Sequence, residues 1–368
     1  MTAITTTRRS GPREFGEAVW TIMVKELRSR MRGRRAPMVL TAYLAVLALI
    51  AYGVYVVVAP VARDAAAIPG AGLSQANASR FVGQSIFAVL SVLQIVLVSM
   101  IAPAFTAGQI SLEREKQTLD LLISTPMRPG AIIIGKLLTA LAFVVLLIVA
   151  AVPITAIVLM YGGASIDDIV RQQVLLLAVA TGFGAVGLFA STLMKRTQAA
   201  TVLTYGAVVT LTLGSAMVFA FWAEVAEQNR TGFGLQWEER APEQLRYLNP
   251  MVGMLDIISR VEVDGPTRFT RPIYQLFGDD LSAGAGGECI GVECDFVEPA
   301  EPGQPVEFGA FGRTDYWWPR VAVSFVGLAA VLTLLSMRLV VPAGLGWRPR
   351  RRRGTAREDD IDVVEVGP

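Results

Sequence analysis

Histidine is absent from the 368 residues of this chain, and cysteine occurs only twice. Without histidine the chain cannot use Ser-His-Asp or Cys-His catalysis, histidine-ligated metals or the commonest proton shuttle at neutral pH. Charged residues are also few, at 17% against about 25% in soluble domains. Hydrophobic residues make up 53%, more than a soluble domain of this length could bury beneath a polar skin. The composition therefore indicates a membrane protein and excludes most enzymes.

Six apolar runs are long enough to cross a membrane. A helix needs about 20 residues to cross the ~30 Å hydrocarbon core. Of the Lys and Arg residues, only Arg320 and Arg338 fall inside the runs. Both lie near run ends, where a long side chain can reach the interface. We predict an all-α polytopic membrane protein with six transmembrane helices. The runs lie at 38–61, 81–106, 137–161, 174–194, 199–222 and 320–341.

Basic residues are distributed unequally around these spans. Of the 33, 22 lie on one side and three in the short loops of the other, while eight lie in the long 223–320 segment, which can translocate regardless of charge. The positive-inside rule therefore predicts a multi-pass protein with both termini cytoplasmic and 223–319 outside. Only four basic residues are Lys, a bias typical of GC-rich prokaryotes, so we expect a prokaryotic plasma membrane. The net charge of +2 gives no support to a nucleic-acid partner.

The outer region behaves like a small separate unit, with aromatic residues for a modest core. Its Cys289 and Cys294 form a candidate disulfide, with two free thiols as the alternative, and no metal site is expected. The predicted parts of the chain are a cytoplasmic tail with an amphipathic interfacial helix (1–37), five spans with a cytoplasmic loop at 107–136 (38–222), the outer region (223–319), the last span (320–341) and a cytoplasmic tail, predicted to be disordered (342–368).

Two glycine motifs resemble nucleotide sites but lack the necessary context. Gly130 to Lys136 fits the first seven positions of a phosphate loop, yet Leu137 stands where Ser or Thr must reach magnesium. Gly182-Phe-Gly184-Ala-Val-Gly187 fits the dinucleotide fingerprint but lies inside a predicted span, without a preceding strand. We interpret these small residues as points where membrane helices approach closely.

The centres of the predicted spans carry no Asp, Glu, Lys, Arg or His. Such groups cost about 2.5–3.5 kcal/mol on insertion scales and are the usual proton and ion relays of carriers and pumps. Ion-coupled transport is therefore disfavoured. Pro103 and Pro153 lie near span ends and are candidate points of bending.

The cytoplasmic loop at 107–136 contains a predicted amphipathic helix. Ser111 can cap its start, and Glu113 and Glu115 favour the positive end of the helix dipole. Thr125-Pro126 would end it, because the residue before proline avoids the α conformation. The alternative is a solvated loop helix without a partner. The apolar stripe on this helix would be formed by Leu112, Leu119, Leu122 and Ile123.

This loop resembles that of the type-2 family of ABC transporter permeases. Residues 13–35, with Phe15 and Val19 on one face, resemble the connecting helix of that family, and Leu248-Asn249-Pro250 resembles its short element before the last span. The long outer region is a departure from many members. The loop match consists of Ile110-Ser111, Glu113-Arg114-Glu115, Thr118-Leu119, Leu122, Thr125-Pro126 and Gly135-Lys136.

The resemblance implies a permease subunit of an exporter, without an ATPase site or cofactor of its own. ATP and Mg would be bound by a separate ABC ATP-binding subunit, and a second permease copy, identical or related, would complete the pathway among membrane lipids. The loop would be the coupling helix, with Glu113, Arg114 and Glu115 as polar contacts and Leu119 and Leu122 as the packing face. The alternative is a non-transporting scaffold that acts on an extracytoplasmic partner.

Overall fold

The computed structural model describes residues 35–67, 75–118, 129–218, 247–261 and 317–340, together with Phe221 and nine residues between 16 and 28. Within these ranges every regular element is a helix, and six stretches are long and apolar enough to span a membrane. The predicted all-α, six-span fold is confirmed. The predicted disulfide, Cys289 with Cys294, and the tail at 342–368 lie outside the described residues.

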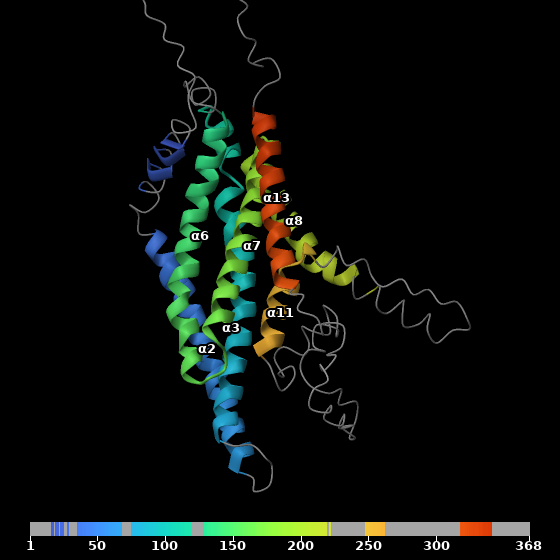
Figure 1. Cartoon of the computed structure of the whole chain (residues 1–368). Coiled ribbons are helices and arrows are strands. Elements are labelled where there is room, and N and C mark those ends of the chain that lie inside the picture. The colour runs from blue at the N-terminus through green and yellow to red at the C-terminus, as the bar shows by residue number, and fades with distance from the viewer. Residues whose placement is uncertain are drawn as a thin grey trace, which may run out of the picture.

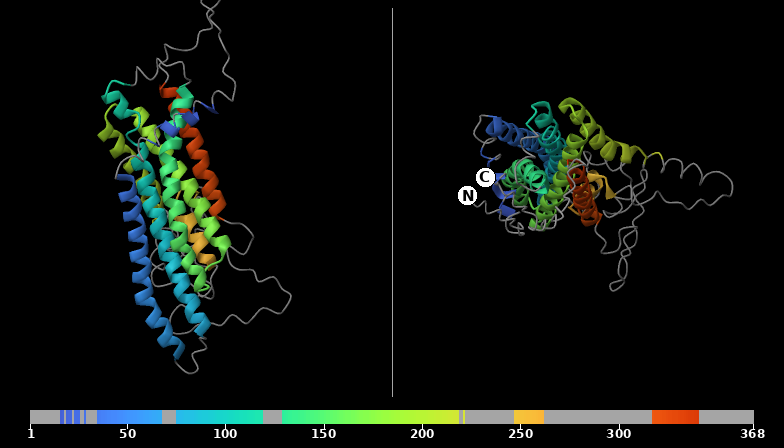
Figure 2. Two further views of the ribbon diagram at one scale, coloured as in Figure 1. Left: turned by 90° about the vertical axis from the view of Figure 1, so that its left-hand side faces the viewer. Right: turned by 90° about the horizontal axis from the view of Figure 1, so that it is seen from above.

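The spans are formed by long helices that run side by side (Figure 1). Seen along the bundle, α2 lies toward one edge and α8 and α13 toward the other (Figure 2). Most helices extend past the predicted spans because their polar ends continue the helix beyond the apolar run. The elements are α2 (Arg35–Ala67), α3 (Gln75–Thr106), α6 (Pro129–Met160), α7 (Ile166–Leu193), α8 (Thr197–Val209) with the π-helix η1 (Thr210–Gly214), and α13 (Trp317–Val340).

Helix α7 forms the centre of the bundle and packs against α3, α6, α8 and α13. Its glycines allow the close approach: a Cβ on Gly182 would overlap the ring of Phe325, and one on Gly187 would overlap the hydroxyl of Thr106. The ring of Phe183 meets that of Phe325 edge-on at 5.1 Å. The interpretation of 182–187 as a helix-packing segment is therefore confirmed.

Part of the predicted outer region belongs to the bundle. Helix α11 (Pro250–Val261) is buried along most of its length and packs against α13, α3 and α7. The prediction of one separate unit at 223–319 was therefore wrong for 247–261. Asn249 caps this helix, since its Oδ1 accepts the N–H of Met251 at 2.9 Å, and Pro250 occupies the first helical position, where no N–H is needed.

Helix α11 also carries a buried ionisable group that the sequence analysis missed. Asp256 is 2% exposed, and its Oδ2 accepts the N–H groups of Trp317 and Trp318 at 2.9 and 3.0 Å, where α13 begins. Burial raises the pKa of this carboxyl. Arg260 lies 3.5 Å from the other oxygen. Both carboxylate oxygens are thus engaged, so Asp256 caps a helix and gives no support to an ion relay.

Two predicted features at the membrane ends stay predictions. Described residues between Gly16 and Arg28 are helical, but their position at a membrane surface is untested. Pro103 and Pro153 lie within continuous helices, α3 and α6. At the first of them, the carbonyl of Pro103 accepts the N–H of Ala107 at 2.9 Å, which keeps the end of α3 helical.

Candidate functional site: the α4 junction

Helix α4 (Ser111–Glu115) follows α3 at the end of the bundle where α7 also ends and α6 and α8 begin. It is much shorter than predicted. The expectation of one helix from Ser111 to Thr125 was wrong, because α4 ends at Glu115. Leu119, Leu122, Thr125 and Pro126, predicted for the packing face and the helix end, lie outside the described residues.

A Schellman motif ends α4. The N–H of Gln117 donates to the carbonyl of Arg114 at 3.1 Å, and that of Thr118 donates to the carbonyl of Glu113 at 3.0 Å. This geometry requires a left-handed residue, and Gln117 has a φ of 56°. A side chain in this conformation costs roughly 1–2 kcal/mol relative to glycine. Sequence reasoning missed this stop because the usual signal, Gly or Asn, is absent.

The start of α4 is capped by another helix. Ser191, fully buried near the end of α7, accepts the N–H groups of Ile110 at 2.8 Å and Ser111 at 3.0 Å through its hydroxyl oxygen. The prediction that Ser111 caps the helix was wrong: Ile110 is the N-cap residue, and Ser111 is the first helical residue. Its own hydroxyl lies 3.3 Å from that of Ser191. The α4 start is therefore bonded to α7.

The end of α4 in turn caps α8. The carboxylate of Glu115 accepts the N–H of Thr197 at 2.7 Å, and the N-cap residue of α8, Arg196, provides no side-chain cap of its own. A carboxylate at this place also favours the positive end of the helix dipole. The two capping contacts lie on either side of the turn at 194–196, so that α4 bridges the junction of α7 and α8.

An ion pair joins α4 to α6. Lys136 donates to Oε1 of Glu113 at 2.7 Å, and the two side chains are 5% and 24% exposed. A lysine this deeply buried requires a negative or polar partner. The pair gives the buried ammonium group of Lys136, which lies beside the buried Gly135 in the first part of α6, its counter-ion.

The structure brings together four of the predicted site residues: Glu113, Glu115, Thr118 and Lys136. Arg114 is half-buried, while Leu112, Lys116 and Gln117 on the same short segment are exposed. Ser191 and Thr197 were missed, because a contact between segments about 80 positions apart leaves no local signal in the sequence. Over the described part of the chain, no group of three or more His, Cys, Asp or Glu could hold a metal ion.

The arrangement is suited to transmitting motion. A displacement of α4 acts on α7 through Ser191, on α8 through Glu115 and on α6 through Glu113, all within one short helix. Packed helices shift between discrete arrangements and do not deform gradually; of these links the Ser191 hydrogen bonds are buried, whereas the Glu115–Thr197 bond is exposed. Helix α4 therefore connects the ends of three spans, α6, α7 and α8.

Comparison with known proteins agrees with this architecture. The chain matches none of the curated proteins with which it was compared. The model of a family described as "ABC-2 family transporter protein" matches residues 20–342, a range that contains all six spans and the α4 junction. The chain therefore belongs to the ABC-2 family of transporter proteins.

Proposed function

We propose that this chain is the permease subunit of an ABC exporter, driven by a separate ATP-binding subunit that docks on α4. The observation that carries the proposal is the triple attachment of α4, which bonds to α6, α7 and α8 at one end of the bundle. A partner that moves this short helix would move half of the spans with it. Family membership supports the same assignment.

The exposed side of the α4 segment supplies the docking surface. Leu112 is 42% exposed, Arg114 is partly exposed, and Lys116 is exposed. Glu113 and Glu115 are engaged within the chain. We therefore assign contact with the partner to the apolar and basic side chains, and transmission of movement to the two carboxylates.

The mechanism is alternating access in a complex of two permease copies and two ATP-binding subunits. Closure of the ATP-binding subunits displaces α4, and α6, α7 and α8 follow because their ends are bonded to it. The interface between the permease copies repacks and opens to the outer side of the plasma membrane. The apolar spans suit an apolar or amphipathic cargo, such as a lipid or a drug.

Purification of the tagged chain from its native membrane tests the docking assignment. The unaltered chain should carry with it a protein with ATP-binding motifs, and the complex should hydrolyse ATP. The double variant Arg114→Glu, Lys116→Glu should lose this partner while its thermal unfolding midpoint is unchanged. Arg80→Glu, at the opposite end of the bundle, is the matched control and should keep the partner.

Two results would contradict the proposal. The absence of any ATP-binding protein from the unaltered preparation would remove the exporter assignment itself. Retention of the partner by the double variant, at the level of the control, would remove only the docking surface on α4.

A further inference from the structure

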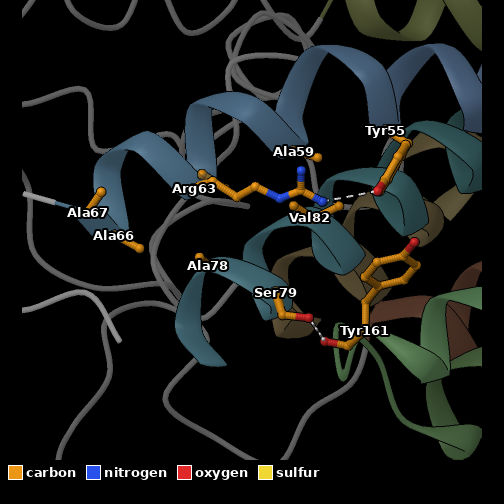
Figure 3. A pocket seen from close by; sticks show the side chains of 10 residues that line it. Tyr55, Ala59, Arg63, Ala66, Ala67, Ala78, Ser79, Val82 and Tyr161 are labelled. Atoms are coloured by element: carbon orange, nitrogen blue, oxygen red, sulfur yellow. Dashed lines mark hydrogen bonds between the residues drawn. The ribbon is translucent and has the colours of Figure 1, made fainter. Parts of the chain in front are cut away.

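A cavity of about 310 Å³ lies between α2 and α3, at the end of the bundle opposite α4. Five alanines and Val82 form most of its wall, and its polar groups belong to Arg63, Tyr55, Tyr161 and Ser79 (Figure 3). Tyr161 comes from the turn after α6, and its backbone carbonyl accepts the hydroxyl of Ser79 at 3.3 Å. Three segments thus build one small hollow.

Arg63 places a cation at the wall of this hollow. Its guanidinium donates to the hydroxyl of Tyr55 at 3.3 Å, and Figure 3 shows the side chain extended along the cavity toward that tyrosine. The ring of Tyr55 rests near that of Tyr161, with centroids 6.0 Å apart. No carboxylate among the described residues pairs with Arg63. A guanidinium has five N–H donors, so most of them can serve a ligand.

The position along α2 corresponds to the headgroup layer of a membrane. The apolar stretch of α2 begins at Pro37, and at 1.5 Å per residue Arg63 lies about 39 Å further along the helix. That exceeds the ~30 Å hydrocarbon core. Tyrosine is enriched at the membrane–water interface, and Tyr55, about 27 Å from Pro37 by the same rise, lies near the inner edge of that interface beside Tyr161.

We infer that this cavity binds the anionic headgroup of a phospholipid from the adjacent leaflet, with the phosphodiester on the Arg63 guanidinium. The alanine wall admits the glycerol portion, and the exposed side chains of Val57 and Val61 on the same turns of α2 offer apolar surface to the acyl chains. The volume is at the lower end of the roughly 300–1,000 Å³ typical of ligand pockets. A cavity of this size holds a lipid headgroup, and the acyl chains lie outside it.

Net charge distinguishes this ligand from a zwitterionic lipid. Because no described carboxylate forms an ion pair with Arg63, its guanidinium can pair with an anionic headgroup, while a choline group would bring a second cation close to it. Charge-assisted hydrogen bonds to phosphate are shorter and stronger than neutral ones. The site therefore selects phosphatidylglycerol over phosphatidylcholine.

Binding to the full-length chain in a non-ionic detergent, measured by native mass spectrometry, tests this site. The probes are dioctanoylphosphatidylglycerol, dioctanoylphosphatidylcholine and free glycerol phosphate. The first should bind most tightly, and Arg63→Gln should weaken it about tenfold or more. Arg80→Gln, which removes a nearby arginine that does not line the cavity, should change nothing.

Ala66→Leu provides an independent variant, because it fills the cavity and leaves every charge in place. It should also weaken binding of the anionic lipid. Unchanged binding by both Arg63→Gln and Ala66→Leu would overturn the site, and an equal loss in Arg80→Gln would reduce it to diffuse surface charge. Equal binding of free glycerol phosphate would replace the lipid with a small soluble anion.

Discussion

The hydroxyl oxygen of Ser191 lies 3.0 Å from the backbone nitrogen of Ser111, so that one helix caps another from 80 positions away. Helix caps are usually local, supplied by the residue just before the helix. Here the N-cap residue of α4 is Ile110, whose side chain offers no acceptor for the first N–H groups of the helix. The start of this short helix is therefore stabilised by α7.

Replacement of Ser191 by alanine should destabilise the α4 junction. Two buried N–H groups would lose their acceptor, at a cost of about 1–3 kcal/mol each. We expect a lower thermal unfolding midpoint in detergent, followed by tryptophan fluorescence, and reduced ATP hydrolysis in the purified complex. Ser191→Thr keeps the acceptor and should retain most of both. Equal losses in the two variants would mean that the bulk at this position, and not the hydroxyl, matters.

The ion pair of Glu113 and Lys136 should show strong coupling in a double-mutant cycle. Removal of one partner from a fully buried pair costs about 3–5 kcal/mol, and somewhat less here because Glu113 is 24% exposed. Glu113→Gln and Lys136→Met should each destabilise the chain. The double variant should lose less unfolding free energy than the two single variants together, by about 0.5–3 kcal/mol. Strict additivity of the three unfolding free energies would argue against the pair.

Two glycines of α7 should respond differently to the same substitution. A Cβ on Gly187 would overlap the hydroxyl of Thr106 and lie 3.1 Å from the Pro103 carbonyl, which cannot move freely. A Cβ on Gly184 would first meet a methyl group of Leu141 at 3.3 Å, which can turn aside. Gly187→Ala should therefore cost about 1–3 kcal/mol, and Gly184→Ala clearly less. The yield of monodisperse protein on gel filtration compares them.

Asp256 should make stability depend on pH in the acid range. Burial raises its pKa in the folded chain above the unfolded value of about 3.9, so the folded state holds its proton more tightly. The stabilisation is complete below the unfolded pKa and is lost as pH rises through the folded pKa. Asp256→Asn removes this titration. The difference in unfolding midpoint between the unaltered chain and Asp256→Asn should thus change between the unfolded and the folded pKa of Asp256. Above the folded pKa it should be constant.

The spans could be predicted because lipid imposes a simple rule that is visible in the sequence: a span needs an uncharged apolar run. That rule does not identify helix α11. Its 12 residues are too few to cross a membrane, and Asp256 and Arg260 make the segment resemble a polar outer loop. In the fold, however, the carboxylate of Asp256 accepts a hydrogen bond from the start of α13. Burial here depends on a partner distant in sequence.

The site was only partly predictable for the same reason. The motif around Glu113 to Glu115 located the α4 segment, but it did not indicate that both carboxylates bond within the chain. The acceptor Ser191 and the donor Thr197 belong to segments whose relation to α4 exists only in the folded protein. The end of α4 at Gln117 could not be predicted, because glutamine is not a residue type that signals a helix stop. Its left-handed conformation belongs to the Schellman hydrogen bonds.

The π-helix η1 has a consequence for chain length. A π-turn holds one residue more than the α-turn it replaces, and here Ser215 bonds to Thr210 five positions back. Deletion of Leu211 would return this stretch to an α-helix with the faces on both sides unrotated. In an ordinary span the same deletion would turn everything beyond it by about 100°. The fifth span can therefore lose a residue at η1. The deletion would cost the hydrogen bond in which the side-chain amide of Asn249 donates to the carbonyl of Thr212 at 3.1 Å.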